Sequence, residues 1–247
     1  MKADPFVQLK LLDVQALDSQ LDGLRAQITS MPETEKLARL GARRDELNIL
    51  VRNLGVDVDD LTAEQRKADR DVESVRTRRE RDQGLIDSGG VSNPKDLERM
   101  LHELESLTRR ISDLEDVEIE VMERLETAQT ARAEAEVEAE KVAAEFADVE
   151  VRRDKRAAEI KAEGAEVTRE RALTVEGIPV DLLDLYGKLR AQKGGVGVAA
   201  LRQRQCGGCR LTLDASILAT MRQAATDEVL RCEECGRILV RTGESGL

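Results

Sequence analysis

A seven-residue repeat of apolar side chains constrains the fold of this chain more than any other feature of its sequence. Between residues 97 and 163, fifteen of the twenty a and d positions are apolar, while charged residues dominate the other positions. Between residues 37 and 86, the same period gives eleven apolar positions of fifteen. This pattern is typical of a coiled-coil seam. The second register passes through Gly55 unbroken, so we predict one helix there, although a helical glycine costs about 1 kcal/mol.

The stretch DSGGVSNPKDL separates the two periodic segments and carries the signals of a stop and a restart. Gly89 and Gly90 can take backbone angles that let the chain reverse. Asn93 suits the cap of a new helix, and Pro94 suits its first position, where a missing N–H does no harm. A connection this short implies that the helices on either side of it are antiparallel neighbours.

A first helical segment, residues 7–31, repeats the apolar period two residues out of phase with the segment that begins at Leu37. Pro32 lies at this phase break, where a proline ends or kinks a helix. The sequence therefore predicts a mainly α fold, a long antiparallel coiled-coil helical hairpin of residues 1–175 with its turn near residues 87–93. Two uninterrupted helices that dimerise in parallel would give the same heptads, so a monomer and a dimer both remain open.

The composition agrees with such a fold and limits the possible partners. Charged residues make up 36% of the chain and aromatic residues 1%, with no tryptophan, which is too little aromatic volume for a compact core of this size. The net charge of −11 argues against unselective binding of nucleic acid. The sequence has neither an apolar run of about 20 residues nor an N-terminal apolar signal segment, so we expect a cytoplasmic protein that does not enter a membrane.

The pattern changes in residues 176–198. The stretch VDLLDLYGKLR predicts a short amphipathic helix, and Gly194, Gly195 and Gly197 then form a flexible linker or a tight turn. A phosphate-binding loop is not predicted, because no strand and helix flank these glycines as that mechanism requires.

All four cysteines lie in the last segment, residues 199–247, as two C-x-x-C pairs separated by 22 residues: Cys206 with Cys209, and Cys232 with Cys235. This spacing is typical of a four-cysteine zinc site, in which each pair directs two thiolates at one ion. A segment this short also needs such help to fold. We predict a small C-terminal zinc ribbon with one structural Zn²⁺, because four protein ligands leave no open position. A redox pair, an iron–sulfur cluster and disulfides are the alternatives.

Four arginines flank the cysteine pairs, namely Arg204, Arg210, Arg231 and Arg237. Zinc with four thiolates carries a local charge of −2, so these arginines either balance that charge or form a surface that contacts phosphates or an acidic partner. Residues 199–247 hold seven arginines and six acids, which is close to neutral.

Nothing in the sequence assembles a catalytic site. The one histidine, His102, lies outside the predicted seam, and the cysteines are committed to the metal. Carboxylates on a solvated coiled-coil surface have no pocket that would shift their pKa values. We therefore predict that the protein is not an enzyme and has no small-molecule substrate.

Three stretches in this order resemble a known family: VSNPKDLERMLHELESL at the turn, IPVDLLDLYGKLR before the ribbon, and C-G-G-C with C-E-E-C-G-R-I-L-V within it. They are similar to the bacterial C4-type zinc-ribbon proteins with a long N-terminal coiled-coil hairpin, and the resemblance covers nearly the whole chain. It implies that all four cysteines are zinc ligands. Relatives in that family include a flagellar chaperone that binds an alternative sigma factor and a flagellin transcript, a role that likeness alone does not transfer.

We expect a non-enzymatic adaptor whose hairpin and ribbon bind protein, RNA or DNA, in transcription or RNA-linked regulation. An alternative is a regulator of the RNA polymerase secondary channel, since such factors place acidic residues at the tip of a coiled-coil hairpin. Asp82, Asp87 and Asp96 lie near the predicted turn, although Asp96 is also explained by the positive start of its helix. A purely structural coiled-coil spacer is the third hypothesis.

Overall fold

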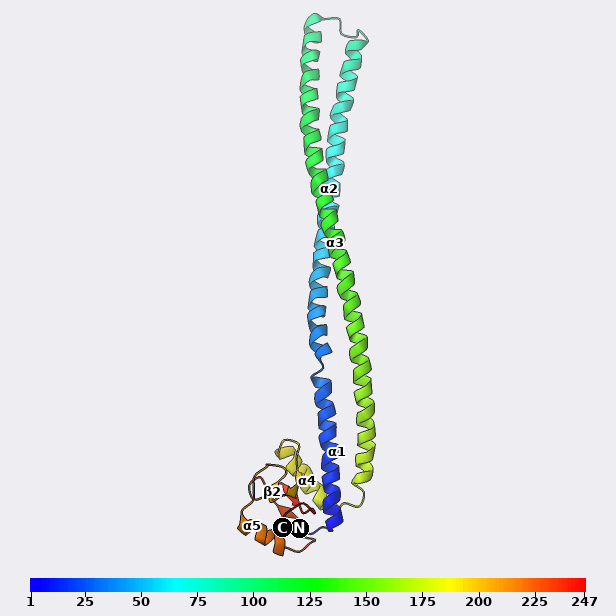
Figure 1. The fold of residues 1–247 in the computed structure, drawn as a ribbon. Helices are drawn as coiled ribbons and strands as arrows, with labels where there is room; N and C mark the ends of the chain where they lie inside the picture. Colours follow the sequence, from blue (N-terminus) through cyan, green and yellow to red (C-terminus); the bar gives the residue numbers. More distant parts are fainter. The chain divides into compact units, whose positions relative to one another are not determined.

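The computed structural model describes residues 1–247 and divides into two compact units. Unit 1 comprises Met1–Thr34 together with Val151–Leu247, and unit 2 comprises Glu35–Glu150. The elements follow one another along the chain (Figure 1) as α1 Pro5–Thr29, α2 Pro32–Asp87, α3 Pro94–Thr174, α4 Val180–Gln192, β1 Val198–Arg202, β2 Gln205–Cys206, α5 Ala215–Gln223, β3 Leu230–Arg231 and β4 Ile238–Val240.

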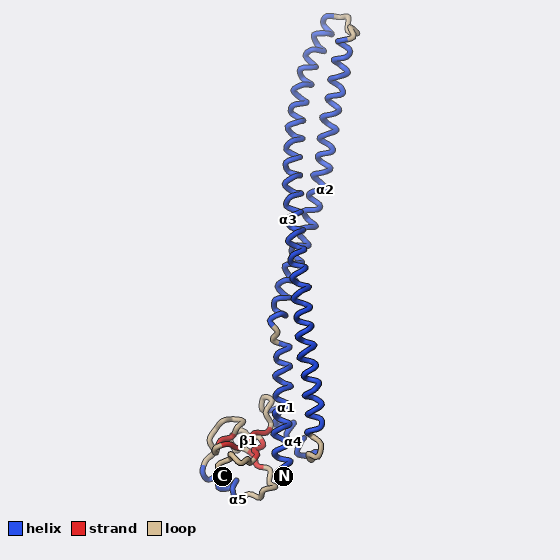
Figure 2. The backbone as a smooth tube through the Cα atoms, turned by 45° about the vertical axis from the view of Figure 1, so that its right-hand side comes forward, coloured by secondary structure: helices blue, strands red, loops and turns tan.

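Unit 2 is an antiparallel pair of helices made by most of α2 and the first part of α3 (Figure 2). Residues at the predicted a and d positions are buried, namely Leu37, Leu47, Leu61 and Val72 of α2 and Leu104, Leu107, Ile111, Val121, Leu125, Ala135, Val142 and Val149 of α3. The helix runs through Gly55 as predicted. The prediction of an antiparallel coiled-coil hairpin is confirmed, and the seams are buried within one chain.

The turn of the hairpin follows the predicted stop and restart. Gly89 has a positive φ of 70°, and the N–H of Gly90 donates to the carbonyl of Leu85 at 3.0 Å. The side chain of Asn93 then accepts a hydrogen bond from the backbone N–H of Lys95 at 3.0 Å, and α3 begins at the next residue, Pro94. Asn93 therefore satisfies one of the N–H groups that the start of a helix leaves without a partner.

In unit 1, α1 packs against the last part of α3. Leu17 and Leu24 of α1 are buried with Ile160 and Val167 of α3, together with Met31, which lies between α1 and α2. α1 ends at Thr29 and α2 begins at Pro32, so the predicted break is a helix end. No helix of the protein has the length and apolar character needed to cross a membrane.

The rest of unit 1 is built on a small sheet with the strand order β2-β1-β4-β3. β1 pairs in parallel with β4, and the other two pairings are antiparallel. Because successive side chains of a strand point to opposite faces, β4 serves two cores. Ile238 and Val240 pack with α1 and α4, whereas Leu239 packs with α5 and the cysteines. The predicted boundaries at residues 175 and 198 both fall inside this unit.

The first residues of the chain form an isolated antiparallel bridge, between Lys2 and Glu228, with the segment that precedes β3, a contact that sequence reasoning missed. The N–H of Ala3 donates to the carbonyl of Asp227 at 2.7 Å, and the N–H of Val229 donates to the carbonyl of Met1 at 3.1 Å. Lys2 adds an ion pair with Asp227 at 3.0 Å. The segment MKA has no strand-like pattern that could have predicted this pairing.

Candidate metal centre

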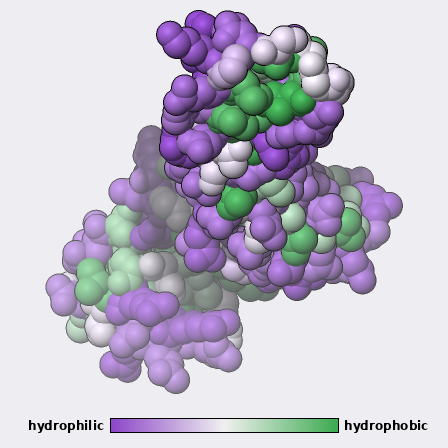
Figure 3. Space-filling model, turned by 90° about the horizontal axis from the view of Figure 1, so that it is seen from above, coloured by the Kyte–Doolittle hydropathy of each residue, from purple (hydrophilic) through white to green (hydrophobic).

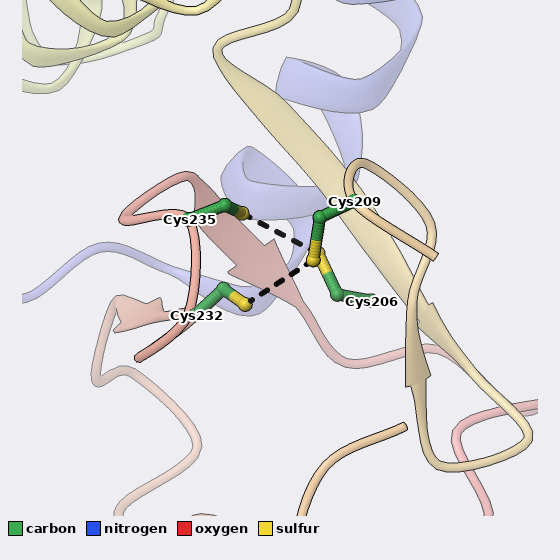
Figure 4. Close-up of side chains that lie close together, drawn as sticks. All are labelled: Cys206, Cys209, Cys232 and Cys235. Atoms are coloured by element: carbon green, nitrogen blue, oxygen red, sulfur yellow. Dashed lines mark hydrogen bonds between the residues drawn. The ribbon is translucent and has the colours of Figure 1, made fainter. Parts of the chain in front are cut away.

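The ribbon has two C-x-x-C turns, a first knuckle from Cys206 to Cys209 and a second knuckle from Cys232 to Cys235. The four cysteine sulfurs converge on one point between these two knuckles (Figure 4). All four Sγ atoms lie within 4.8 Å of one another, with Cys206 and Cys235 3.9 Å apart and Cys209 and Cys232 3.8 Å apart. A zinc ion with four sulfurs at about 2.3 Å makes a tetrahedron whose edges are about 3.8 Å. Disulfide sulfurs lie at about 2.05 Å, so these cysteines are not disulfide-bonded. The site fits one structural Zn²⁺.

Short backbone hydrogen bonds shape both knuckles. The N–H of Arg210 donates to the carbonyl of Cys206 at 2.7 Å, and the N–H of Gly236 donates to the carbonyl of Cys232 at 2.8 Å. Gly236 has a φ of 73°, which a residue with a side chain rarely adopts. Each C-x-x-C pair is thereby folded back so that both of its sulfurs face the same point.

Burial and hydrogen bonding act in opposite directions on the pKa values of the cysteine thiols. Burial raises the pKa of the Cys206 thiol and raises the pKa of Cys232 to about 12. Burial acts in the same direction on Cys235, but hydrogen bonds from the backbone and side chain of Arg237 and from neighbouring thiols lower its pKa to about 7. Bound zinc takes thiolates and supplies the opposing charge, and its closed shell of four sulfurs stabilises the fold without offering a catalytic position.

The four flanking arginines occupy two kinds of environment. Arg204 and Arg210 are exposed beside the first knuckle, and both have positive φ values, of 66° and 62°. Arg231 is also exposed, but its Nε donates to the carbonyl of Gly236 at 3.0 Å. Arg237 is half-buried, and its guanidinium donates to two backbone carbonyls. Arg204 and Arg210 are thus both exposed, although the Nε of Arg204 also donates to the carbonyl of Gly246 at 3.4 Å.

The acidic residues near the turn of the hairpin are all engaged with neighbours. Asp82 is paired with Arg78 at 3.8 Å and with Arg81 at 3.5 Å. Asp96 is paired with Arg99 one turn further along α3, and Asp87 accepts a hydrogen bond from a neighbouring glutamine at 2.9 Å. The three aspartates therefore do not form a cluster of free carboxylates.

A buried ion cluster at the base of the hairpin was not predicted. Asp18 of α1 is only 5% exposed and accepts hydrogen bonds from Arg171 at 2.6 Å and from the hydroxyl of Tyr186 at 2.7 Å. Arg190 lies 3.7 Å from the same carboxylate. Burial alone would raise the pKa of Asp18, but these hydrogen bonds and the two guanidinium charges lower it. Three helices, α1, α3 and α4, meet at this one carboxylate.

Comparison with known proteins agrees with both parts of this description. The CT398-like coiled coil hairpin domain matches residues 14–194, and the C4-type zinc ribbon domain matches residues 205–239. An uncharacterized protein of Mycobacterium tuberculosis is 32% identical over 241 residues, which cover 98% of each chain. A Mycobacterium leprae protein is 26% identical over 223 residues, covering 90% of this chain and 95% of that one.

Solved structures show the same fold. A protein of Mycobacterium smegmatis is 34% identical and superposes with a TM-score of 0.84, covering 98% of this chain and all of the other. The CT398 protein of Chlamydia trachomatis is 16% identical and has a TM-score of 0.69 over 96% of this chain and 98% of that chain. The HP0958 protein of Helicobacter pylori, at 15% identity, gives 0.52 over 98% and 99% of the two chains. The last two likenesses concern the fold alone.

Proposed function

This chain belongs to the family of CT398-like coiled-coil hairpin proteins and ends in a C4-type zinc ribbon, and on that premise we propose that it is a non-enzymatic adaptor. Its ribbon binds an acidic protein surface or the phosphates of a nucleic acid, while the hairpin serves as the arm. We further propose that this partner acts in transcription or RNA-linked regulation.

The distribution of charge around the two knuckles is the observation that carries this proposal. Arg204 and Arg210 are exposed beside the first knuckle, whereas the second knuckle exposes Glu233 and Glu234. The ribbon is close to neutral as a whole, and the second knuckle balances its glutamates with Arg231 and Arg237, so the excess of positive charge lies at the first knuckle. An acidic or phosphate-bearing partner would therefore contact the first knuckle, with Arg231 at its border. Arg237, whose guanidinium donates to backbone carbonyls of the protein, would stabilise this surface without contacting the partner.

Charge reversal separates this surface from the rest of the ribbon. A crosslinked pull-down would compare the wild type with the double variant Arg204→Glu/Arg210→Glu and with Arg222→Glu on α5, identifying both bound RNA and bound protein. Arg222 is an exposed arginine outside the knuckles and serves as the matched control. We expect the double variant alone to lose its partner. Equal binding by all three proteins would contradict the assignment of these arginines.

The end of the hairpin supports a second candidate function. Figure 3, which views the molecule from above, shows apolar side chains gathered at this end and surrounded by hydrophilic ones. Leu85 and Leu101 are 47% and 49% exposed there. A tip of this kind would suit a regulator that inserts its hairpin into a channel of RNA polymerase, with Asp82, Asp87 and Asp96 as the tip acids. Failure of the protein to co-purify with RNA polymerase would count against this role.

The spacer hypothesis makes a different prediction in the same experiment. A Cys232→Ser/Cys235→Ser variant removes half of the zinc ligands but leaves unit 2 unchanged. If every partner of the wild type is also captured by this variant, the ribbon is not the recognition module and the hairpin alone acts. Loss of a partner in this variant would exclude a purely structural spacer.

A further inference from the structure

Arg237 connects the zinc centre to the segment that precedes the sheet. Its backbone carbonyl accepts a hydrogen bond from the N–H of Cys232 at 3.0 Å, so it is part of the second knuckle. Its side chain lies beside the Cys235 thiol and donates from Nε to the carbonyl of Val196 at 2.9 Å and from Nη2 to the carbonyl of Lys193 at 2.8 Å. The first knuckle closes over it, because a Cβ added at Gly208 would lie 2.6 Å from the Cδ of Arg237.

The segment that Arg237 holds is the turn between α4 and β1, residues 193–197. Gly194 and Gly195 have φ values of 67° and 89°, which make this turn tight. The carbonyl of Gly197 accepts a hydrogen bond from the N–H of Ile238 at 3.0 Å, so the turn is also tied to β4. The position of the turn therefore depends on the strand and the arginine that carry the second knuckle.

Gln15 of α1 binds the other side of the same turn. Its Oε1 accepts a hydrogen bond from the N–H of Gly197 at 2.7 Å, and its Nε2 donates to the carbonyl of Gly195 at 2.8 Å. Gln15 is only 7% exposed and lies beside the fully buried Leu11 and Val14. A buried side-chain amide that loses its partners costs about 1–3 kcal/mol, so the turn contributes to the docking of α1, beside its apolar packing and the Asp18 cluster.

We propose that zinc binding in the ribbon and the docking of α1 at the base of the hairpin are thermodynamically coupled through Arg237, the turn of residues 193–197 and Gln15. Without zinc the two knuckles separate, and Arg237 loses its contact with Gly208 of the first knuckle. The carbonyls of Lys193 and Val196 then lose the guanidinium that donates to them. Gln15 then loses its two partners in the turn and keeps only Ser19 of its own helix, to which its Nε2 donates at 2.9 Å. Both Arg237 and Gln15 are positioning residues in this scheme, and the coupling holds whatever the ribbon binds.

Because the coupling is reciprocal, the proposal can be tested by changing a residue of α1 and measuring zinc binding. If zinc stabilises the docking of α1, then docking must tighten zinc binding by the same factor, which is typically about 5- to 150-fold. Gln15→Leu removes both hydrogen bonds to the turn from a residue on another helix. Gln20→Leu is the matched control, because Gln20 is an exposed glutamine on the same helix.

The first measurement is zinc affinity of the full chain by competition with a chromophoric chelator. We expect Gln15→Leu to weaken zinc binding about 10-fold and Gln20→Leu to leave it unchanged. In a double-mutant cycle with Arg237→Met, the double variant should lose less zinc-binding free energy than the sum of the two single losses, because both substitutions break the same connection. Wild-type zinc affinity in Gln15→Leu, or full additivity in the cycle, would overturn the proposal.

A second measurement needs no variant and so does not depend on how the variants fold. Hydrogen exchange of the wild type would be followed by mass spectrometry with zinc bound and after its removal by a chelator. We expect faster exchange in residues 11–19 and 193–197, as well as in the ribbon, with the helices of unit 2 as the unchanged internal reference. If the ribbon amides lose protection while residues 11–19 keep theirs, zinc and α1 are not coupled.

Discussion

The two units of this protein are stabilised in opposite ways. In unit 2, apolar side chains recur along a single seam, and the ion pairs across it are exposed, as in the pair of Arg124 and Glu64 with 55% and 53% of their side chains exposed. In unit 1, a few sites each hold several elements: the cysteine cluster, the Asp18 cluster and the turn bound by Gln15. Stability spread over a repeat tolerates single changes, whereas stability concentrated at a few sites does not.

Removal of zinc is the largest expected test of this contrast. In the Cys232→Ser/Cys235→Ser variant, we expect no bound zinc and rapid proteolysis within residues 199–247, because metal binding is part of the folding free energy of so small a module. Unit 2 should keep its helices. Metal analysis, limited proteolysis and circular dichroism would measure these outcomes, and a ribbon that resists protease without zinc would break the contrast.

The Asp18 cluster gives the next largest expected effect. Asp18→Asn leaves Arg171 without its buried counter-charge, while Arg190 keeps its ion pair with Asp22, and breaking a buried pair costs about 3–5 kcal/mol. Chemical denaturation of unit 1 at pH 7 would measure the loss. A change below about 1 kcal/mol would show that the cluster is no more important than an exposed pair.

The same cluster predicts a pH dependence with a definite sign. Because the pKa of Asp18 is lowered in the folded protein, its contribution is fully present above the unfolded value of about 3.9 and is lost as the pH falls through the folded value. The difference in stability between the wild type and Asp18→Asn should thus be constant from about pH 5 upward and should shrink below about pH 4. A difference that grows on acidification would contradict this assignment.

The contrast also explains which features could be predicted from the sequence. The seam of unit 2, the helix start at Asn93 and the cysteine pairs could be predicted from local sequence patterns. Each of these features requires particular residues at a fixed period or spacing along the chain. The contacts that unite unit 1 join residues far apart in the chain, with sequence separations of 153 for Arg171 and Asp18 and 182 for Gly197 and Gln15. A single buried polar contact has no period. The sequence therefore could not distinguish Arg237, which is half-buried, from the three exposed arginines that also flank the cysteine pairs.

Two glycine-to-alanine substitutions should have effects of opposite sign in the two units. At Gly197 of unit 1, an added Cβ would lie 2.6 Å from the backbone oxygen of Tyr186 and 3.0 Å from the N of Arg190. The backbone must shift, so we expect a loss of about 2 kcal/mol. At Gly55 of unit 2, the nearest atom would be the Nη1 of Arg132 at 4.0 Å, and alanine should stabilise the helix by up to about 1 kcal/mol. Denaturant unfolding of both variants would test the pair.

The smallest expected effect is at the exposed pair of Glu64 and Arg124, whose charged atoms lie 3.3 Å apart. Exposed pairs contribute about 0.2–1 kcal/mol, so Glu64→Gln should lower the stability of unit 2 by no more than about 0.5 kcal/mol. High salt should remove most of that difference, because exposed charges are screened. The surrounding surface is acidic, with Asp57, Asp60 and Glu123 nearby, so loss of one negative charge also relieves repulsion. A loss above about 2 kcal/mol that survives high salt would show that unit 2, too, depends on single sites.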